Sequence, residues 1–201
     1  SEQEVDLLLL DVPQALLDTG TPTATLAAVL ERMPCDVGLL AGRETISPAG
    51  IGATHPVLVP FGGDEHEWAA VEIAAWLASV QGSSLRLLGT AASPKRGRRD
   101  ASRLLGRAAL LVQKVTGVAT EPTLVQPGEA AVLDAADDAG LVALGLSPRW
   151  RSDGLGTVRL TLLKHARPPV LLVRGGLRPG GLAPATSLTH FTWTLASPTS
   201  T

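Results

Sequence analysis

The chain alternates short runs of consecutive apolar residues with longer segments whose apolar residues recur every three or four positions. Short apolar runs rich in Val and Leu are typical of strands buried on both faces, whereas the longer spacing indicates helices with one buried face. From residue 56 onward, this alternation predicts five strands and four helices. The strands are expected at residues 56–61, 83–91, 119–126, 141–145 and 168–176, and the helices at 64–80, 101–117, 128–140 and 156–166.

Strict alternation of strands and helices predicts a parallel sheet, because each helix carries the chain back to the start of the next strand. The helix expected at residues 64–80 begins with Asp64 and Glu67, which have the spacing of a capping box. The predicted fold class is therefore α/β, with a five-stranded parallel sheet and helices on both faces.

The first 42 residues predict one more β-α-β unit, with strands at residues 5–12 and 35–42 and a helix at 21–33. Thr21 is the expected N-cap of that helix and Pro22 its first residue. Residues 6–42 also resemble residues 140–175, and a one-residue gap keeps the two in register. The matched residues include Leu7 with Leu141, Gly20 with Gly154, Val37 with Val170 and Gly42 with Gly175. We interpret the first unit as a partial repeat of the fold that follows.

A lone β-α-β unit cannot bury both faces of its two strands. We therefore expect it to pack beside the final strand, in the same chain or in a second protomer. The predicted domains are a partial repeat at 1–43, a linker at 44–55, the main domain at 56–175 and a tail at 176–201. In the tail, Phe191, Trp193 and Leu195 alternate with polar residues, which predicts a strand that docks on an apolar face or edge.

Composition narrows the class of protein. The chain has 201 residues, 45% of them hydrophobic, and a net charge of −2, which excludes a general nucleic-acid binder. Its single cysteine, Cys35, excludes an internal disulfide and fits a reducing, cytoplasmic setting. No apolar run approaches the ~18 residues of a membrane span, and the acidic N-terminus lacks a signal-peptide pattern.

The loop at residues 145–157 is the strongest candidate for binding chemistry. It joins a predicted strand to a predicted helix and contains Gly145, Gly154 and Gly156, with Thr157 at the helix start. Backbone N–H groups at a helix start attract anions, and glycine lets the backbone approach them closely. Arg149 and Arg151 add positive charge, so the loop predicts an anion site.

Other motifs are incomplete. The stretch "HEWAA" is half of a zinc-protease motif, and the four histidines show no ligand spacing, so we expect no metal site. No G-x-S-x-G motif is present, and we expect no catalytic residues. The basic cluster at residues 94–103 is either a solvated loop or a contact for anionic lipid or a dianionic ligand.

Residues 56–175 resemble the universal stress protein family. The resemblance rests on "PVLVPFGGDEHEWAAVEIAAWLA", "PTLVQPGEAAVLDAA" and "LVALGLSPRWRSDGLGTVRLTLLKHARPPVLLVR". It implies an α/β fold with five parallel strands and a homodimer formed through the last strand. It also implies ATP held by an aspartate after the first strand and by a loop of the form G-x2-G-x9-G-[ST].

The sequence departs from that nucleotide pattern at specific positions. The aspartate falls on Gly62, the second loop glycine is replaced by Pro148, and the loop is two residues shorter. We therefore expect weak ATP binding or none. The candidate ligand-binding residues are Gly62, Gly63, Asp64, Gln126, Gly128, Gly145, Arg149, Arg151, Gly154, Gly156 and Thr157.

A narrower resemblance is to the cytosolic C-terminal region of bacterial cation/proton antiporters, carried by "PVLVPFGGDEHEWAA", "GLSPRWRSDGLG" and "GLRPGGLAPATSLTHFTWTL". It implies a non-enzymatic regulatory module with a membrane transporter domain in the same full-length chain. An adenine nucleotide or a cyclic dinucleotide such as cyclic di-AMP would be its signal. The alternative is a freestanding universal stress protein that binds ATP or AMP.

Overall fold

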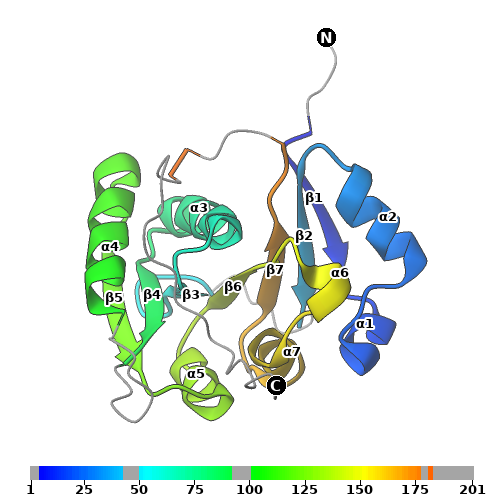
Figure 1. Cartoon of the computed structure of the whole chain (residues 1–201). Helices are drawn as coiled ribbons and strands as arrows, with labels where there is room; N and C mark the ends of the chain where they lie inside the picture. Colours follow the sequence, from blue (N-terminus) through cyan, green and yellow to red (C-terminus); the bar gives the residue numbers. More distant parts are fainter. Residues whose placement is uncertain (1–4, 43–49, 92–100, 178–180, 183–201) are drawn as a thin grey trace, which may run out of the picture.

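The computed structural model describes residues 5–42, 50–91, 101–177 and 181–182. These residues form one seven-stranded sheet with helices on both faces (Figure 1). The strands are β1 (Leu7–Asp11), β2 (Asp36–Ala41), β3 (Val57–Pro60), β4 (Leu85–Thr90), β5 (Thr120–Val125), β6 (Leu141–Gly145) and β7 (Val170–Arg174). The helices are α1 (Gln14–Thr19), α2 (Ala24–Arg32), α3 (Glu65–Gln81), α4 (Ser102–Thr116), α5 (Glu129–Ala136), α6 (Trp150–Asp153) and α7 (Thr157–His165).

The strand order is β1-β2-β7-β6-β3-β4-β5. The five strands from β7 to β5 are all parallel, which confirms the predicted five-stranded parallel sheet. The partial repeat adds β1 and β2, which are parallel to each other, and β2 pairs with β7 in the antiparallel direction. The first unit therefore packs beside the final strand in the same chain, as expected, and makes the sheet mixed.

The junction between β2 and β7 has an internal two-fold symmetry. Its central pair is Leu39 with Leu172, the same position in the two copies of the repeat. In the repeat, Val37 is equivalent to Val170 and Ala41 to Arg174. Val37 pairs with Arg174 and Ala41 pairs with Val170, so the same two positions meet on each side of the centre. The partial repeat thus occupies the place that a second protomer would take in a dimer built through the last strand. Because β6 and β2 pair with both edges of β7, that strand has no open edge.

Two layers of side chains hold the sheet. On one face, α3 and α4 cover Val57, Val59, Leu85 and Leu87, and on the other α2, α5 and α7 cover Leu58, Leu88 and Leu172. Neighbouring residues of one strand enter opposite cores because strand side chains alternate in direction. Cys35 is buried.

The start of α2 corrects one prediction. The N-cap is Thr23 rather than Thr21, and the helix begins at Ala24 rather than Pro22. The Thr23 hydroxyl accepts a hydrogen bond from the N–H of Leu26 at 3.4 Å, whereas the N–H of Thr21 is bonded back to the Thr19 hydroxyl. The local turn after α1 thus takes Thr21 out of the helix.

Two short helices, α1 and α6, lie where the sequence suggested only loops. They follow β1 and β6, the equivalent strands of the two repeats, so the loop architecture is shared as well. Each is followed by a glycine with positive φ, Gly20 at 68° and Gly154 at 64°. The tail strand expected around Phe191 lies outside the described residues, and the domain boundaries remain a prediction.

Candidate functional site

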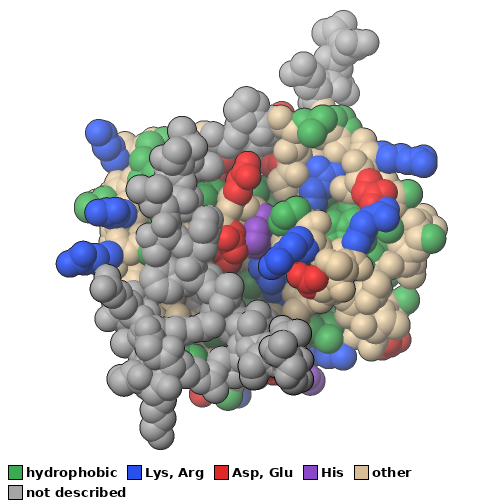
Figure 2. Space-filling model, in the orientation of Figure 1, with side chains coloured by type: hydrophobic (Ala, Val, Ile, Leu, Met, Phe, Trp, Pro, Cys, Tyr) green, Lys and Arg blue, Asp and Glu red, His purple; other side chains and the backbone are tan. Residues whose placement is uncertain are grey.

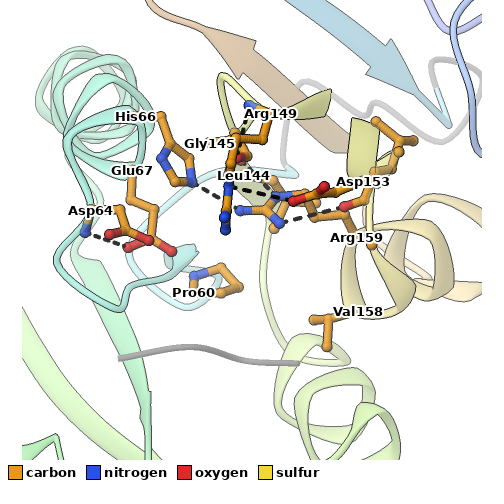
Figure 3. Close-up of a pocket in the computed structure, with 14 residues that line it drawn as sticks. Pro60, Asp64, His66, Glu67, Leu144, Gly145, Arg149, Asp153, Val158 and Arg159 are labelled. Carbon is orange, nitrogen blue, oxygen red and sulfur yellow. Dashed lines mark hydrogen bonds and ion pairs between the residues drawn. The ribbon is translucent and has the colours of Figure 1, made fainter. Parts of the chain in front are cut away.

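A cavity of about 180 Å³ lies beyond the carboxyl ends of β3 and β6 (Figure 3). The chain order reverses between these neighbouring strands, because β4 lies on the far side of β3 and β7 on the far side of β6. Such a switch point is the usual ligand position in an open α/β sheet. The lining residues are Pro60, Asp64, His66, Glu67, Leu144, Gly145, Ser147, Arg149, Asp153, Gly154, Leu155, Gly156, Val158 and Arg159.

The N-terminus of α7 forms one wall of this cavity. Gly156 is the N-cap, with φ 77° and ψ 157°, a conformation that favours glycine. No side chain caps this helix start, and Gly154 and Gly156 both line the cavity. The positive end of the α7 dipole therefore faces the cavity and favours an anion there.

Arg159, in the first turn of α7, places a partly buried guanidinium in the cavity. Its Nε donates to the carbonyl of Gly145 at 2.7 Å, and a second nitrogen lies 3.1 Å from Nε2 of His66. Burial lowers its pKa, and nearby Glu67 opposes the shift. Among the described residues, no carboxylate forms an ion pair with this guanidinium. The cavity thus contains a desolvated cation with spare donor capacity.

Glu67 is buried at the opposite wall and belongs to the start of α3. Its Oε2 accepts hydrogen bonds from the N–H of Gly62 at 2.7 Å and of Asp64 at 3.1 Å. Asp64 and Glu67 form the capping box that the sequence predicted. Burial raises the pKa of Glu67 to about 7, because desolvation outweighs these two hydrogen bonds.

His66 lies between Glu67 and Arg159 (Figure 3). Burial, followed by the charge of Arg159, lowers its pKa to about 4. The ring is therefore neutral at pH 7. Because a guanidinium only donates, Nε2 of His66 accepts from Arg159 and the ring proton lies on Nδ1.

The described residues contain one group of side chains that could hold a metal ion. Its potential ligand atoms lie within 4.8 Å of one another and belong to Asp64, His66 and Glu67. Their donor atoms are already engaged: Nε2 of His66 faces a cation, and Oε2 of Glu67 accepts two backbone N–H groups. A metal ion would also meet the charge of Arg159. We therefore assign no metal to this group.

The structure brings five of the predicted residues to the cavity: Asp64, Gly145, Arg149, Gly154 and Gly156. The remaining candidates, Gly62, Gly63, Gln126, Gly128, Arg151 and Thr157, are not among its lining residues. Gly62 contacts the cavity only indirectly, because its N–H donates to the carboxylate of Glu67, which lines it. Thr157 is the first residue of α7, and Gly128 is the N-cap of α5.

Arg151 contacts the partial repeat instead of the cavity. Its guanidinium forms an ion pair with Glu31 of α2 and lies over the ring of Trp150, 5.4 Å from the ring centre. Arg149 keeps a place at the cavity but pairs with Asp153 at 3.4 Å. Arg159, which the loop pattern did not indicate, is the partly buried cation of the site.

A second cavity, of about 550 Å³, adjoins the first and shares Asp64 and His66 with it. Pro148, which replaces the second loop glycine, lines this neighbouring cavity rather than the first. The N–H that proline lacks is therefore missing from the neighbouring cavity and not from the first.

The shifted pKa values of Glu67 and His66 predict opposite effects of pH on stability. A raised carboxyl pKa stabilises the fold below pH 4.5, and this is lost as pH rises towards 7. A lowered histidine pKa stabilises the fold above pH 6.5, and this is lost as pH falls towards 4. Each contribution amounts to about 3 kcal/mol in the free energy of unfolding. Between pH 4.5 and 6.5 one contribution falls while the other rises, so stability should change little with pH in this range.

Urea unfolding at several pH values tests this balance. Glu67→Gln should make stability rise with pH between 4.5 and 6.5, and His66→Gln should make it fall over the same range. Parallel pH profiles for the two variants would show that burial does not shift these groups as inferred.

Comparisons with known proteins address the fold. No protein-family model and no curated protein matches the sequence. A universal stress protein from Archaeoglobus fulgidus is 21% identical, covering 59% of this chain and 98% of its own, with a TM-score of 0.51. The universal stress protein from Archaeoglobus fulgidus in complex with dAMP is 20% identical over 59% of this chain and 97% of its own, with a TM-score of 0.50.

A third solved structure extends over more of the chain. This universal stress protein from Archaeoglobus fulgidus DSM 4304 is 13% identical and covers 78% of this chain and 56% of its own, with a TM-score of 0.56. No helix among the described residues is long and apolar enough to cross a membrane. At these identities the matches establish architecture, and we conclude that the chain has a universal stress protein-like α/β fold.

Proposed function

We propose that this chain is a regulatory module that binds an anionic adenine mononucleotide in the cavity between β3 and β6. The observation that carries the proposal is Arg159, a desolvated guanidinium without an ion-pair partner among the described residues. It lies beside the uncapped N-terminus of α7, so two sources of positive potential meet in one cavity. A phosphate group would compensate both.

The size of the cavity favours a mononucleotide. Its volume of about 180 Å³ is below the ~300 Å³ usual for small-molecule sites, so it suits a phosphate and a sugar rather than a cyclic dinucleotide. Adenine is supported by the protein that shares this fold and was solved with dAMP. Cyclic di-AMP is retained as an arm of the test, since the adjoining cavity of about 550 Å³ offers further room.

Titration calorimetry with AMP, cyclic AMP, ATP, cyclic di-AMP and inorganic phosphate tests the proposal. We expect AMP or cyclic AMP to bind more tightly than ATP, because a cavity of about 180 Å³ suits one phosphate and a sugar rather than a triphosphate. Arg159→Met should weaken binding about 10- to 100-fold, the value of a charge-assisted hydrogen bond of ~1.5–3 kcal/mol. Arg151→Met, which removes a cation of the same loop outside the cavity, is the control and should bind normally. Equal binding by the two variants would refute the assignment.

A non-catalytic role is part of the proposal. His66 accepts from Arg159, and Glu67 is held by two backbone N–H groups, so neither is placed to activate a water molecule. We therefore expect no nucleotide hydrolysis. Release of phosphate from ATP by the full chain, abolished in Glu67→Gln, would contradict this.

The setting we propose is the cytoplasmic face of a membrane, in a cation/proton antiporter. The support is the sequence resemblance of "PVLVPFGGDEHEWAA", "GLSPRWRSDGLG" and the tail. The full-length gene product decides: a series of long apolar helices in the same polypeptide would support the transporter. A gene product without them would favour a freestanding universal stress protein that binds AMP or ATP.

A homodimer also belongs to the proposal, although β7 has no open edge for it. We propose that two copies meet at the outer edge of β1, where the sheet of the described residues ends. Leu7 and Leu9 are exposed along that strand, with 38% and 52% of their surface accessible. Unpaired edges of this kind are ready templates for association.

A further inference from the structure

Positive charge is concentrated in one short segment of an otherwise acidic chain. Between residues 95 and 114 there are seven Lys or Arg residues and one Asp, a net charge of +6. The whole chain carries −2, so the remaining residues carry −8. An asymmetry of this size creates a local positive potential that the overall charge conceals.

The described part of this segment is α4, an amphipathic helix without an acidic residue. Its inner side packs Leu105, Ala108 and Val112 into the core. On its outer side, Arg103, Arg107, Leu110 and Lys114 follow one another at spacings of four, three and four residues, which places them in one stripe. Figure 2 shows Lys and Arg side chains projecting from the side of the molecule where Figure 1 places α4.

The stripe is accessible. Arg103, Arg107 and Lys114 are all exposed, and no carboxylate among the described residues forms an ion pair with any of them. The apolar residue between them, Leu110, has 70% of its surface accessible, and Val115 nearby has 57%. A surface leucine flanked by exposed cations is suited to an interface that is both anionic and apolar.

We propose that the outer face of α4, defined by Arg103, Arg107, Leu110 and Lys114, binds an anionic lipid surface. The cations would lie at the level of the phosphate groups and Leu110 would enter the boundary with the acyl chains, as in interfacial amphipathic helices. The three cations of this face, Arg103, Arg107 and Lys114, each add to the attraction of an anionic surface, and burial of Leu110 adds an apolar contribution.

A lipid surface explains this face better than a nucleic acid. Sites for single-stranded nucleic acid pair cations with aromatic side chains that stack on bases. The stripe of Arg103, Arg107, Leu110 and Lys114 contains no aromatic residue, and its apolar member, Leu110, is aliphatic. Leucine is favourable where a headgroup region meets hydrocarbon.

Co-sedimentation of the full chain with vesicles tests the proposal. Vesicles of phosphatidylglycerol and phosphatidylcholine in equal parts should bind the chain, and raised salt or vesicles of phosphatidylcholine alone should abolish binding. Each neutralised cation is worth roughly fivefold in affinity, so the double variant Arg103→Gln with Arg107→Gln should lose about 30-fold. Leu110→Ser should also weaken binding.

The matched control is the pair Arg32→Gln with Arg167→Gln, which removes the same charge from two exposed positions outside α4. It should bind vesicles like the unaltered chain, and circular dichroism should show that all variants are folded. If the control pair lost as much vesicle affinity, the overall net charge rather than the face of α4 would be the cause, and the proposal would be overturned. Equal binding to neutral and anionic vesicles would overturn it as well. Binding to duplex DNA that depends on Arg103 and Arg107 but not on Leu110, without binding to vesicles, would assign the face to a nucleic acid.

Discussion

A chain shortened to begin at Gly50 should lose about 4 kcal/mol of unfolding free energy and should associate with itself. The shortened chain keeps the bridge between Gly52 and His55 but lacks β1, α1, α2 and β2. Removing β2 opens the whole edge of β7, which pairs with β2 over five residue positions. It also uncovers Leu172, fully buried against Leu39 and its neighbours. Loss of packing around buried leucines alone costs 2–5 kcal/mol.

Chemical unfolding and sedimentation equilibrium measure the two effects. The bared edge of β7 is the surface that the partial repeat covers with a two-fold arrangement, so the shortened chain should form dimers through it. A chain lacking only residues 1–4 serves as the control, because it retains β1 entire. Unchanged stability and a monomeric mass for the shortened chain would show that the partial repeat is an appendage. The mass of the full chain tests dimerisation at β1 in the same experiment.

The order of strands and helices could be predicted because each element carries its own periodicity. Runs such as "LVALG" are apolar at successive positions, which only burial on both faces explains. The antiparallel junction of β2 with β7 is different in kind. The repeat indicated that β2 is equivalent to β7, and the open edge of β7 indicated where it would pack, but no residue pattern specified the direction.

The central residue of the site was missed, although the sequence contains a signal for it. Arg159 lies three residues before Leu162 and four before Leu163 in α7, and both leucines are buried. A cation at that spacing belongs to the inner face of α7, where an unpaired charge is costly without a function. The glycine pattern drew attention instead to Arg151, whose partner Glu31 lies in the other repeat and is apparent only from the fold.

Glu67 illustrates what sequence spacing cannot supply. The capping box with Asp64 was predictable from three residues of separation. Its burial and its hydrogen bond with the N–H of Gly62 depend on how the loop after β3 turns back over the start of α3. The raised pKa of Glu67 follows from that tertiary arrangement. The sequence alone therefore could not show that the Glu67 carboxyl group lies beside Gly62, the position of the family aspartate.

Gly145 should tolerate no side chain at all, for a reason unrelated to phosphate. A Cβ placed on Gly145 would lie 2.4 Å from the carbonyl oxygen of His66 and 2.8 Å from Cα of Glu67. Both are backbone atoms of α3, which packs directly on the end of β6. Gly145→Ala must therefore separate a helix from a strand in the core, and we expect a loss of about 3 kcal/mol or more in the free energy of unfolding.

Gly106 is the matched control with the opposite expected sign. It lies inside α4, and a Cβ placed there meets no atom within 4 Å. Gly106→Ala should therefore stabilise the chain by about 1 kcal/mol, because alanine restricts the unfolded chain and favours the helix. Urea unfolding of both variants measures the difference. If Gly145→Ala kept full stability but lost nucleotide binding, close approach of a ligand rather than helix packing would be the reason for glycine at this position.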